Sequence, residues 1–290
     1  MLNNAKLRLI TAMLIFGTIG LFVRFIDLPS SVIALARGLV GMLFLLVVTA
    51  IKKKPVSVAS VRKNVLWLLL SGVALGFNWV LLFEAYRFTT VATATLCYYL
   101  APIAALLLSC VLYGEKMTVK KSVCALTALV GMAGVSGFLP NGKIPRAEIK
   151  GVLFGLAAAA LYATVILLNK KIRDISPYDK TIVQLGVSAV VMAVYCLFTV
   201  RFDSLSLDVK TLSLLLLVGV VHTGITYLLY FGAIGEISVS ASAILSYIDP
   251  VTALIISWLV LKESTTLYGV LGAVVVLASA LISELPKREK

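Results

Sequence analysis

Long apolar segments separated by short polar ones occur ten times along this chain of 290 residues. A helix rises about 1.5 Å per residue and the hydrocarbon core of a bilayer is about 30 Å thick, so about 20 apolar residues cross it. The predicted spans are residues 8–26, 30–51, 64–84, 91–112, 120–138, 151–169, 179–200, 211–232, 238–261 and 266–283. We therefore predict an all-α integral membrane protein with ten transmembrane helices.

The composition agrees with this class. Charged residues make up 13% of the chain, whereas a soluble domain has about 25%. The net charge of +13 comes largely from short basic clusters between the apolar segments, such as residues 52–54 and 170–171. Anionic lipids attract such clusters at the membrane surface. We therefore expect membrane lipid as a partner and no nucleic acid, because no basic domain is predicted outside the spans.

The chain divides into two similar halves. Its longest connection, residues 139–150, contains Pro140 and Pro145, and we interpret it as a linker between repeats at residues 1–138 and 151–290. A shift of 148 residues aligns Gly76, Phe83, Ala85, Val91, Tyr99, Pro102, Ala105, Leu106, Ser109 and Glu115 with Gly224, Phe231, Ala233, Val239, Tyr247, Pro250, Ala253, Leu254, Ser257 and Glu263. Because five spans are an odd number, the second repeat must enter the membrane from the opposite side.

The distribution of basic residues predicts the orientation. If the N-terminus is cytoplasmic, most lysines and arginines fall in cytoplasmic connections, as the positive-inside rule requires. Ten spans then return the C-terminus to the same side. We expect a multi-pass protein of a bacterial inner membrane with both termini in the cytoplasm.

Prolines interrupt the fourth and ninth predicted spans at Pro102 and Pro250. A proline inside a helix removes one hydrogen bond and kinks the helix, so the freed carbonyl must face protein or a cavity rather than lipid. Paired interruptions in two repeats point to the central site of a transporter. Thirteen residues after each proline stands a glutamate, Glu115 or Glu263, for which we expect helix-end contacts near the gates.

Three ionisable residues stand out because they lie away from the ends of the predicted spans, where each costs a few kcal/mol. Asp249, directly before Pro250, is a candidate for binding a substrate amine or a proton. Its alternative role is an ion pair with Arg37 or hydrogen bonds to backbone freed by the proline. Arg37 is a candidate for a substrate carboxylate, unless it pairs with Asp249 or extends to the membrane surface. His222 is a second candidate for proton coupling, or a packing residue.

Aromatic and neutral polar residues surround these positions. Aromatic faces beside one acid suit an organic cation or an aromatic amino acid, although ordinary helix packing explains any single ring equally well. The further candidates for substrate binding are Asn78, Trp79, Tyr98, Tyr99, Tyr162, Tyr227, Ser246 and Tyr247.

We find no sequence motif for metal binding, cofactor binding or catalysis. The four cysteines lie inside apolar segments without a Cys-x-x-Cys pair or a histidine at ligand spacing. The chain also has no nucleophile elbow, no phosphate-binding loop and no paired carboxylates. We therefore expect no metal, no cofactor and no enzyme activity.

Two motifs resemble the EamA-type branch of the drug/metabolite transporter superfamily. They run from Tyr99-Leu100-Ala101-Pro102 to Gly114-Glu115-Lys116-Met117-Thr118 and from Ile248-Asp249-Pro250 to Lys262-Glu263-Ser264-Thr265-Thr266. The resemblance implies a ten-helix bundle, a central cavity and alternating access. The first span has no acidic residue, so the proton mechanism of the four-span multidrug exporters of this superfamily does not carry over.

Together these features predict a secondary active transporter of a small organic metabolite. An amino acid or amine-like compound is favoured, with proton coupling as an option. Glycine ridges such as Gly72 with Gly76 are interpreted as packing within one chain, so we expect a monomer or a weak homodimer. The alternatives are a channel or lipid scramblase, or a non-transporting membrane receptor or enzyme subunit.

Overall fold

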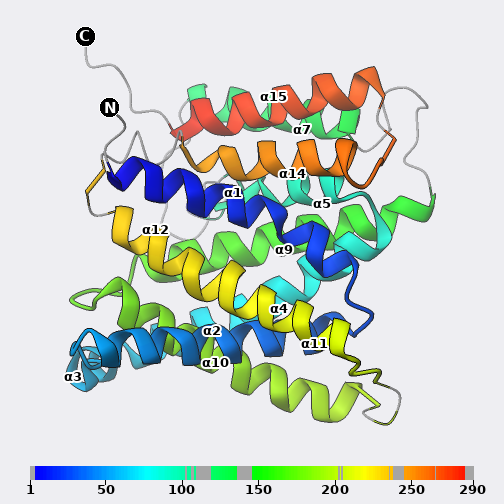
Figure 1. Cartoon of the computed structure of the whole chain (residues 1–290). Coiled ribbons are helices and arrows are strands. Elements are labelled where there is room, and N and C mark those ends of the chain that lie inside the picture. The colour runs from blue at the N-terminus through cyan, green and yellow to red at the C-terminus, as the bar shows by residue number, and fades with distance from the viewer. Residues whose placement is uncertain are drawn as a thin grey trace.

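The computed structural model of the chain is a bundle of helices that run alongside one another (Figure 1). The residues it describes contain no strand, which confirms the predicted all-α class. They are residues 4–101, 103–105, 108, 119–135, 146–201, 203, 205–234, 236–237, 245–264 and 266–284.

Six helical stretches are long and apolar enough to cross a membrane. They are α1 (Asn4–Arg24), α2 (Ser30–Ile51), α4 (Val65–Phe88), α9 (Arg146–Asn169), α10 (Pro177–Thr199) and the continuous stretch formed by α11 (Val209–Gly219), η2 (Val220–Ile225) and α12 (Thr226–Ile234). The four other predicted spans coincide with shorter apolar helices, α5 (Val91–Tyr98), α7 (Val119–Val135), α14 (Ile248–Leu259) and α15 (Leu267–Glu284). The count of ten membrane helices therefore stays a prediction.

Helix starts are fixed by side-chain caps at the ends of the bundle. Thr90, Ser176 and Asp208 each accept a hydrogen bond from the backbone amide three residues later, at 3.0, 3.0 and 2.8 Å. Each bond satisfies an amide that the helix itself leaves unpaired. Pro177 occupies the first position of α10, where its missing N–H is not needed.

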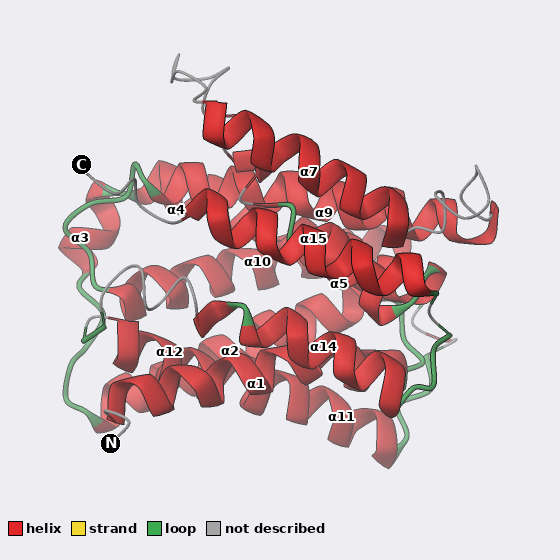
Figure 2. Cartoon of the chain, turned by 90° about the horizontal axis from the view of Figure 1, so that it is seen from above, coloured by secondary structure: helices red, strands yellow, loops and turns green. Residues whose placement is uncertain are grey.

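Several helices of one half of the sequence pack against helices of the other half. α4 packs against α9 and α10, whereas α1 packs against α12 and α14. Two further pairs join equivalent positions in the halves, α2 with α10 and α7 with α15. Figure 2 shows α7 and α15 side by side and α1 beside α14. The third predicted span of each half thus packs on the first span of the other half.

Glycines permit two of these close approaches. A Cβ atom added to Gly131 in α7 would lie 2.8 Å from the carbonyl oxygen of Gly272 in α15. One added to Gly17 in α1 would lie 2.5 Å from the carbonyl oxygen of Asp249 in α14. Small residues of this kind let helices pack closely in lipid, where the hydrophobic effect does not bring helices together. Gly17 therefore determines how near α1 lies to Asp249.

Both interrupted segments contain a break in the helix. α5 ends at Tyr98, residues 99–100 form a turn, and the chain is helical again at Ala101. In the second half Tyr247 forms the turn and α14 begins at Ile248. Pro250 consequently lies in the first turn of α14 and not at a kink inside a helix, which differs from the prediction. A first turn accepts proline because its amides have no intrahelical partner. Pro102 lies outside the described residues.

Polar side chains join the halves at the end of the bundle where α4 begins. The amide of Asn64 donates to the carbonyl of Arg173 at 2.8 Å and accepts from its N–H at 3.1 Å. The amide of Gln184 donates to Ser71 at 2.6 Å and to Asn169 at 2.8 Å. These contacts connect α4 with α9, α10 and the connection between them.

The outer surface of the bundle is apolar. Large side chains such as Phe198 (84% exposed), Leu126 (64%) and Leu153 (60%) project from three different helices. Apolar exposure on this scale is unusual for a soluble monomer. It fits helices whose outer faces lie in hydrocarbon.

Candidate functional site

Aromatic side chains from several helices meet between the two helix breaks. Tyr98 of α5 stacks on Tyr162 of α9, with ring centroids 5.2 Å apart. Tyr99 lies 6.3 Å from Tyr98 and 6.4 Å from Tyr247, which forms the second break. All four rings are half-buried. We use the name central cluster for Arg37, Trp79, Tyr98, Tyr99, Tyr162, Tyr227, Tyr247 and Asp249.

Asp249 connects the two breaks directly. It stands in the first turn of α14, and its carboxylate accepts a hydrogen bond from the Tyr99 hydroxyl at 2.5 Å. A hydrogen bond to a charged oxygen is about twice as strong as a neutral one. This bond therefore ties the break of the first half to the break of the second. Ser246 lies three residues before Asp249 and is half-buried.

Arg37 enters the cluster from α2 and is 5% exposed. Its Nε donates to the Thr223 hydroxyl at 3.0 Å, and the Tyr227 side chain lies close to it. The guanidinium carbon lies 4.1 Å from the centroid of the Trp79 ring, which is a cation–π distance. Arg37 does not extend to the membrane surface, contrary to one of the predicted alternatives.

The ion pair between Arg37 and Asp249, the alternative to a functional role for these residues, is not formed. Among the described residues, the ion pairs within 4.0 Å lie near the ends of the bundle, and none includes either residue. The two charges are nevertheless within electrostatic range of each other. The cluster thus contains one cationic and one acidic side chain that the protein keeps apart.

Asn78 acts as a brace between two helices. Its side chain is fully buried, and its amide donates to the carbonyl of Ala158 in α9 at 2.6 Å. The Tyr98 hydroxyl lies 3.5 Å from its oxygen. Asn78 therefore holds α4 against α9 at the edge of the central cluster.

His222 is 1% exposed and lies in the π-helical turn η2. Its Nε2 lies 2.8 Å from the Thr18 hydroxyl, and its ring stands edge-on to Phe22. The Thr18 hydroxyl donates to the carbonyl of Ile15 at 2.7 Å. Because a hydroxyl has one hydrogen to donate, we assign the proton of this histidine to Nε2. His222 contacts α1 and not Asp249.

Thr18, Thr223 and the π-helical turn were not predicted as part of the site. Thr223 adjoins His222 in sequence, but only the folded chain places it on Arg37. A π-turn adds a residue to a helix without changing its apolar character, so periodicity gives no signal for it. π-turns occur preferentially at functional sites.

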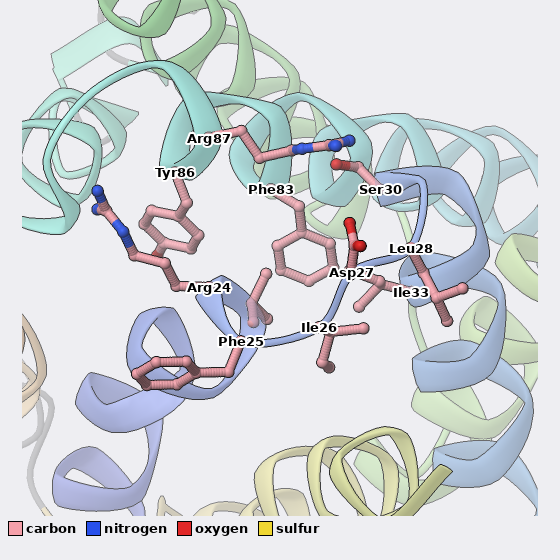
Figure 3. A pocket seen from close by; sticks show the side chains of 11 residues that line it. Arg24, Phe25, Ile26, Asp27, Leu28, Ser30, Ile33, Phe83, Tyr86 and Arg87 are labelled. Atoms are coloured by element: carbon pink, nitrogen blue, oxygen red, sulfur yellow. The ribbon is translucent and has the colours of Figure 1, made fainter. Parts of the chain in front are cut away.

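A pocket of about 350 Å³ opens at one end of the bundle (Figure 3). It lies between the end of α1, the start of α2 and the last turns of α4, with charged side chains such as Asp27 and Arg87 in its wall. Phe83 also lines it, and the centroid of that ring lies 5.9 Å from the Arg37 guanidinium carbon. The Phe83 ring therefore stands between this pocket and the central cluster.

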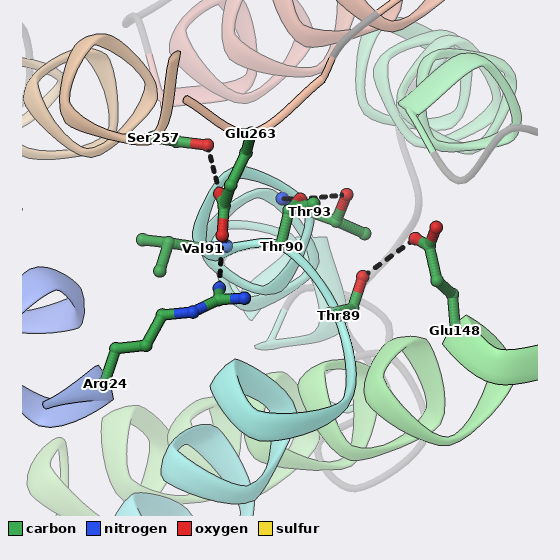
Figure 4. A network of polar contacts seen from close by, with 8 residues as sticks. All are labelled: Arg24, Thr89, Thr90, Val91, Thr93, Glu148, Ser257 and Glu263. Atoms are coloured by element: carbon green, nitrogen blue, oxygen red, sulfur yellow. Dashed lines mark hydrogen bonds and ion pairs between the residues drawn. The ribbon is translucent and has the colours of Figure 1, made fainter. Parts of the chain in front are cut away.

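Glu263 lies at the same end and connects three segments (Figure 4). Its carboxylate pairs with Arg24 of α1, accepts from the Val91 amide of α5 at 3.0 Å, and accepts from the Ser257 hydroxyl of α14. We call these four residues the Glu263 network. Its repeat counterpart, Glu115, lies outside the described residues. Within the described part of the chain, no cluster of three histidine, cysteine or acidic residues could hold a metal ion.

Two segments of the chain, residues 5–137 and 149–285, match the EamA-like transporter family. The chain belongs to this family. It is therefore a multi-pass membrane protein, and a transport role is supported.

Relatives extend over most of the chain. The chain is 29% identical to the uncharacterized transporter YxxF of Bacillus subtilis over 288 residues, which cover 99% of this chain and 92% of that protein. It is also 29% identical to an uncharacterized transporter of Archaeoglobus fulgidus, with 69% of each chain covered. These names agree with the expectation of no enzyme activity. A solved crystal structure shares the fold, with a TM-score of 0.66 and 17% identity over 98% of both chains.

Proposed function

We propose that this protein is a secondary active transporter that moves a small organic metabolite by alternating access, with the solute bound in the central cluster. The observation that carries this proposal is the hydrogen bond between Tyr99 and Asp249, which joins two helix breaks inside an apolar bundle. Broken helices that meet near the midplane form the substrate sites of several transporter folds. Polar groups at such a depth are otherwise unfavourable.

The exchange of helix partners supports an inverted repeat of two five-helix halves. α4 packs on α9 in the same way that α1 packs on α12, which is the relation expected from a pseudo-two-fold axis in the membrane plane. α1 begins and α15 ends at the same end of the bundle (Figure 1). This supports an even number of membrane crossings with both termini on one side. Our proposal has ten crossings in a bacterial inner membrane, and the distribution of basic residues places both termini in the cytoplasm.

The chemistry of the cluster favours an amino acid or an amine-like compound. Asp249 offers a carboxylate to an ammonium group, and the surrounding tyrosine rings offer faces for stacking or cation–π contact. Asp249 is also the first candidate for a proton carrier, and His222 is the second.

Counterflow in proteoliposomes tests the proposal. Vesicles preloaded with one amino acid or amine from a panel should accumulate the same labelled compound, and the flux should saturate. A fourfold excess of unlabelled compound outside should compete. Flux that rises linearly with concentration would indicate a channel, and lipid transfer without solute exchange would indicate a scramblase. Tight binding without exchange would indicate a receptor.

Proton coupling needs a separate measurement. Uptake driven by an imposed pH gradient should lose its concentrative component in Asp249→Asn. Counterflow at equal pH should also be weaker in this variant, because the same carboxylate binds the ammonium group, so the measurement is the ratio of pH-driven uptake to counterflow. His222→Gln serves as the comparison at the second candidate. If Asp249→Asn keeps the full pH dependence, the proton is carried elsewhere.

A further inference from the structure

The Arg37 guanidinium is buried in the bundle, and the described part of the chain gives it no counter-ion. No carboxylate among the described residues lies within 4.0 Å of it, although the side chain is 5% exposed. An unpaired charge at this depth costs a few kcal/mol by insertion scales. Buried charges in proteins are therefore normally paired. The missing anion is not supplied by the neighbouring Asp249, which is bound to Tyr99 instead.

The protein fixes the orientation of this guanidinium from several sides. The Thr223 hydroxyl accepts from Nε at 3.0 Å, and the Trp79 ring covers one face at 4.1 Å. Thr223 donates its own hydrogen to the carbonyl of Val218 at 3.2 Å, so its oxygen is left as an acceptor for Arg37. Val218 lies five residues before Thr223, and the π-helical turn η2 begins between them, at Val220. The arginine is thus held before any ligand arrives.

A held guanidinium presents a planar set of donors that matches a carboxylate with two parallel hydrogen bonds. We propose that Arg37 is a preformed receptor for the carboxylate of the transported solute, with Thr223 and Trp79 as positioning residues. This inference rests on the proposed function and narrows its substrate class. The solute carries a carboxylate at Arg37, and an ammonium group of the same solute faces Asp249. Simple amines, which lack the carboxylate, leave Arg37 unpaired and bind weakly.

Three compounds with one common side chain test this assignment: an amino acid, its carboxamide and its decarboxylated amine. The panel spans several side chains, from small to aromatic, and each compound is assayed by counterflow and by the melting temperature of the detergent-purified protein. The wild type should bind and exchange the amino acid (the acid) more strongly than its carboxamide (the amide) or its decarboxylated amine. Arg37→Gln should weaken binding of the acid about 10- to 100-fold, because a hydrogen bond to a charged group contributes about 1.5–3 kcal/mol. The same variant should change binding of the amide less than threefold.

Two conservative variants separate charge from geometry. Arg37→Lys keeps the positive charge but loses the planar pair of donors, so it should retain part of the preference for the acid. Thr223→Val keeps the shape but removes the acceptor for Nε. It should raise the KM for the acid several-fold with an unchanged maximal rate and an unchanged KM for the amide. A purely structural role of Thr223 would instead lower the amount of folded protein and affect all three compounds equally.

The outcomes separate this inference from the proposed function. If the wild type exchanges amines as readily as the acids and Arg37→Gln does not alter their ratio, the receptor role is wrong while the transport role stands. If the wild type exchanges no member of the panel, the proposed function and the receptor role both fail. Should Arg37→Gln not fold, the ratio of acid to amide in Arg37→Lys decides, because an unchanged ratio would overturn the assignment.

Discussion

The central cluster and the Glu263 network differ in how many partners their buried charges have. Glu263, with a side chain 8% exposed, has three donors from three segments of the same chain. Arg37 is buried to a similar extent, yet no described carboxylate pairs with it. This fold can therefore surround a buried charge with partners when its role is to hold helices together. Arg37 lacks such a carboxylate in the described part of the chain, and in our proposal the bound solute supplies it.

The largest loss of stability is expected at Glu263, whose carboxylate has three partners. Glu263→Ala should destabilise the protein by about 3 kcal/mol, because it removes the acceptor for Arg24, Ser257 and the Val91 amide at once. Glu236→Ala is the matched control. Glu236 pairs with Arg8 at 2.8 Å, but both are substantially exposed, so its loss should cost less than about 1 kcal/mol. Thermal melting in detergent compares the two, and equal shifts would contradict the contrast.

Gly17→Ala should destabilise by about 2 kcal/mol, because its new methyl group would overlap the Asp249 carbonyl and Thr252. It should also displace Asp249 and lower the rate of counterflow. Gly131→Ala offers a control of similar crowding between α7 and α15, away from the cluster. It should lower the melting temperature without changing the KM. Normal transport by folded Gly17→Ala protein would show that Asp249 tolerates displacement.

Removal of one hydroxyl tests the bond between the two helix breaks. Tyr99→Phe deletes the donor to Asp249 and should reduce the rate of counterflow about tenfold. Tyr98→Phe removes a hydroxyl that lies 3.5 Å from Asn78, a long contact, and should change the rate about twofold or less. The ratio of the two rates is the measurement, and a larger loss in Tyr98→Phe would reverse the importance assigned to the two residues.

The smallest effect is expected just before Glu263. Lys262 has a φ of 53°, a left-handed conformation that an L side chain adopts at a cost of about 1 kcal/mol. The repeat alignment places Gly114 at the equivalent position of the first half. Lys262→Gly should therefore raise the melting temperature slightly or leave it unchanged. A clear loss of stability would mean that the lysine side chain has a role of its own.

The helical class and the family could be predicted because apolar segments and the two Pro-to-Glu motifs are local features of the sequence. The positions of the helix breaks were harder to predict from the sequence. A proline within an apolar segment indicates an interruption, but the pattern around Pro250 does not distinguish a kink from a helix start. Only the backbone shows that α14 begins two residues before this proline.

The residues of the central cluster could likewise be predicted only in part. The sequence could select Arg37 and Asp249, because ionisable residues are rare in apolar segments. It could not decide whether they pair, since this depends on which faces of α2 and α14 meet. Thr223 escaped prediction for the same reason. Threonine is common in membrane helices, and its contact with Arg37 spans 186 residues of sequence.

The π-helical turn between α11 and α12 holds one residue more than an α-helix of the same rise would need. Removing that residue would let the turn close as a regular α-helix, in which each amide bonds to the carbonyl four residues back. The hydroxyls of Thr223 and Thr226 instead donate to carbonyls five residues back, those of Val218 and Val221, at 3.2 and 2.6 Å. The wider turn thus orients two threonine hydroxyls, and the oxygen of one of them is the acceptor that holds the Arg37 Nε.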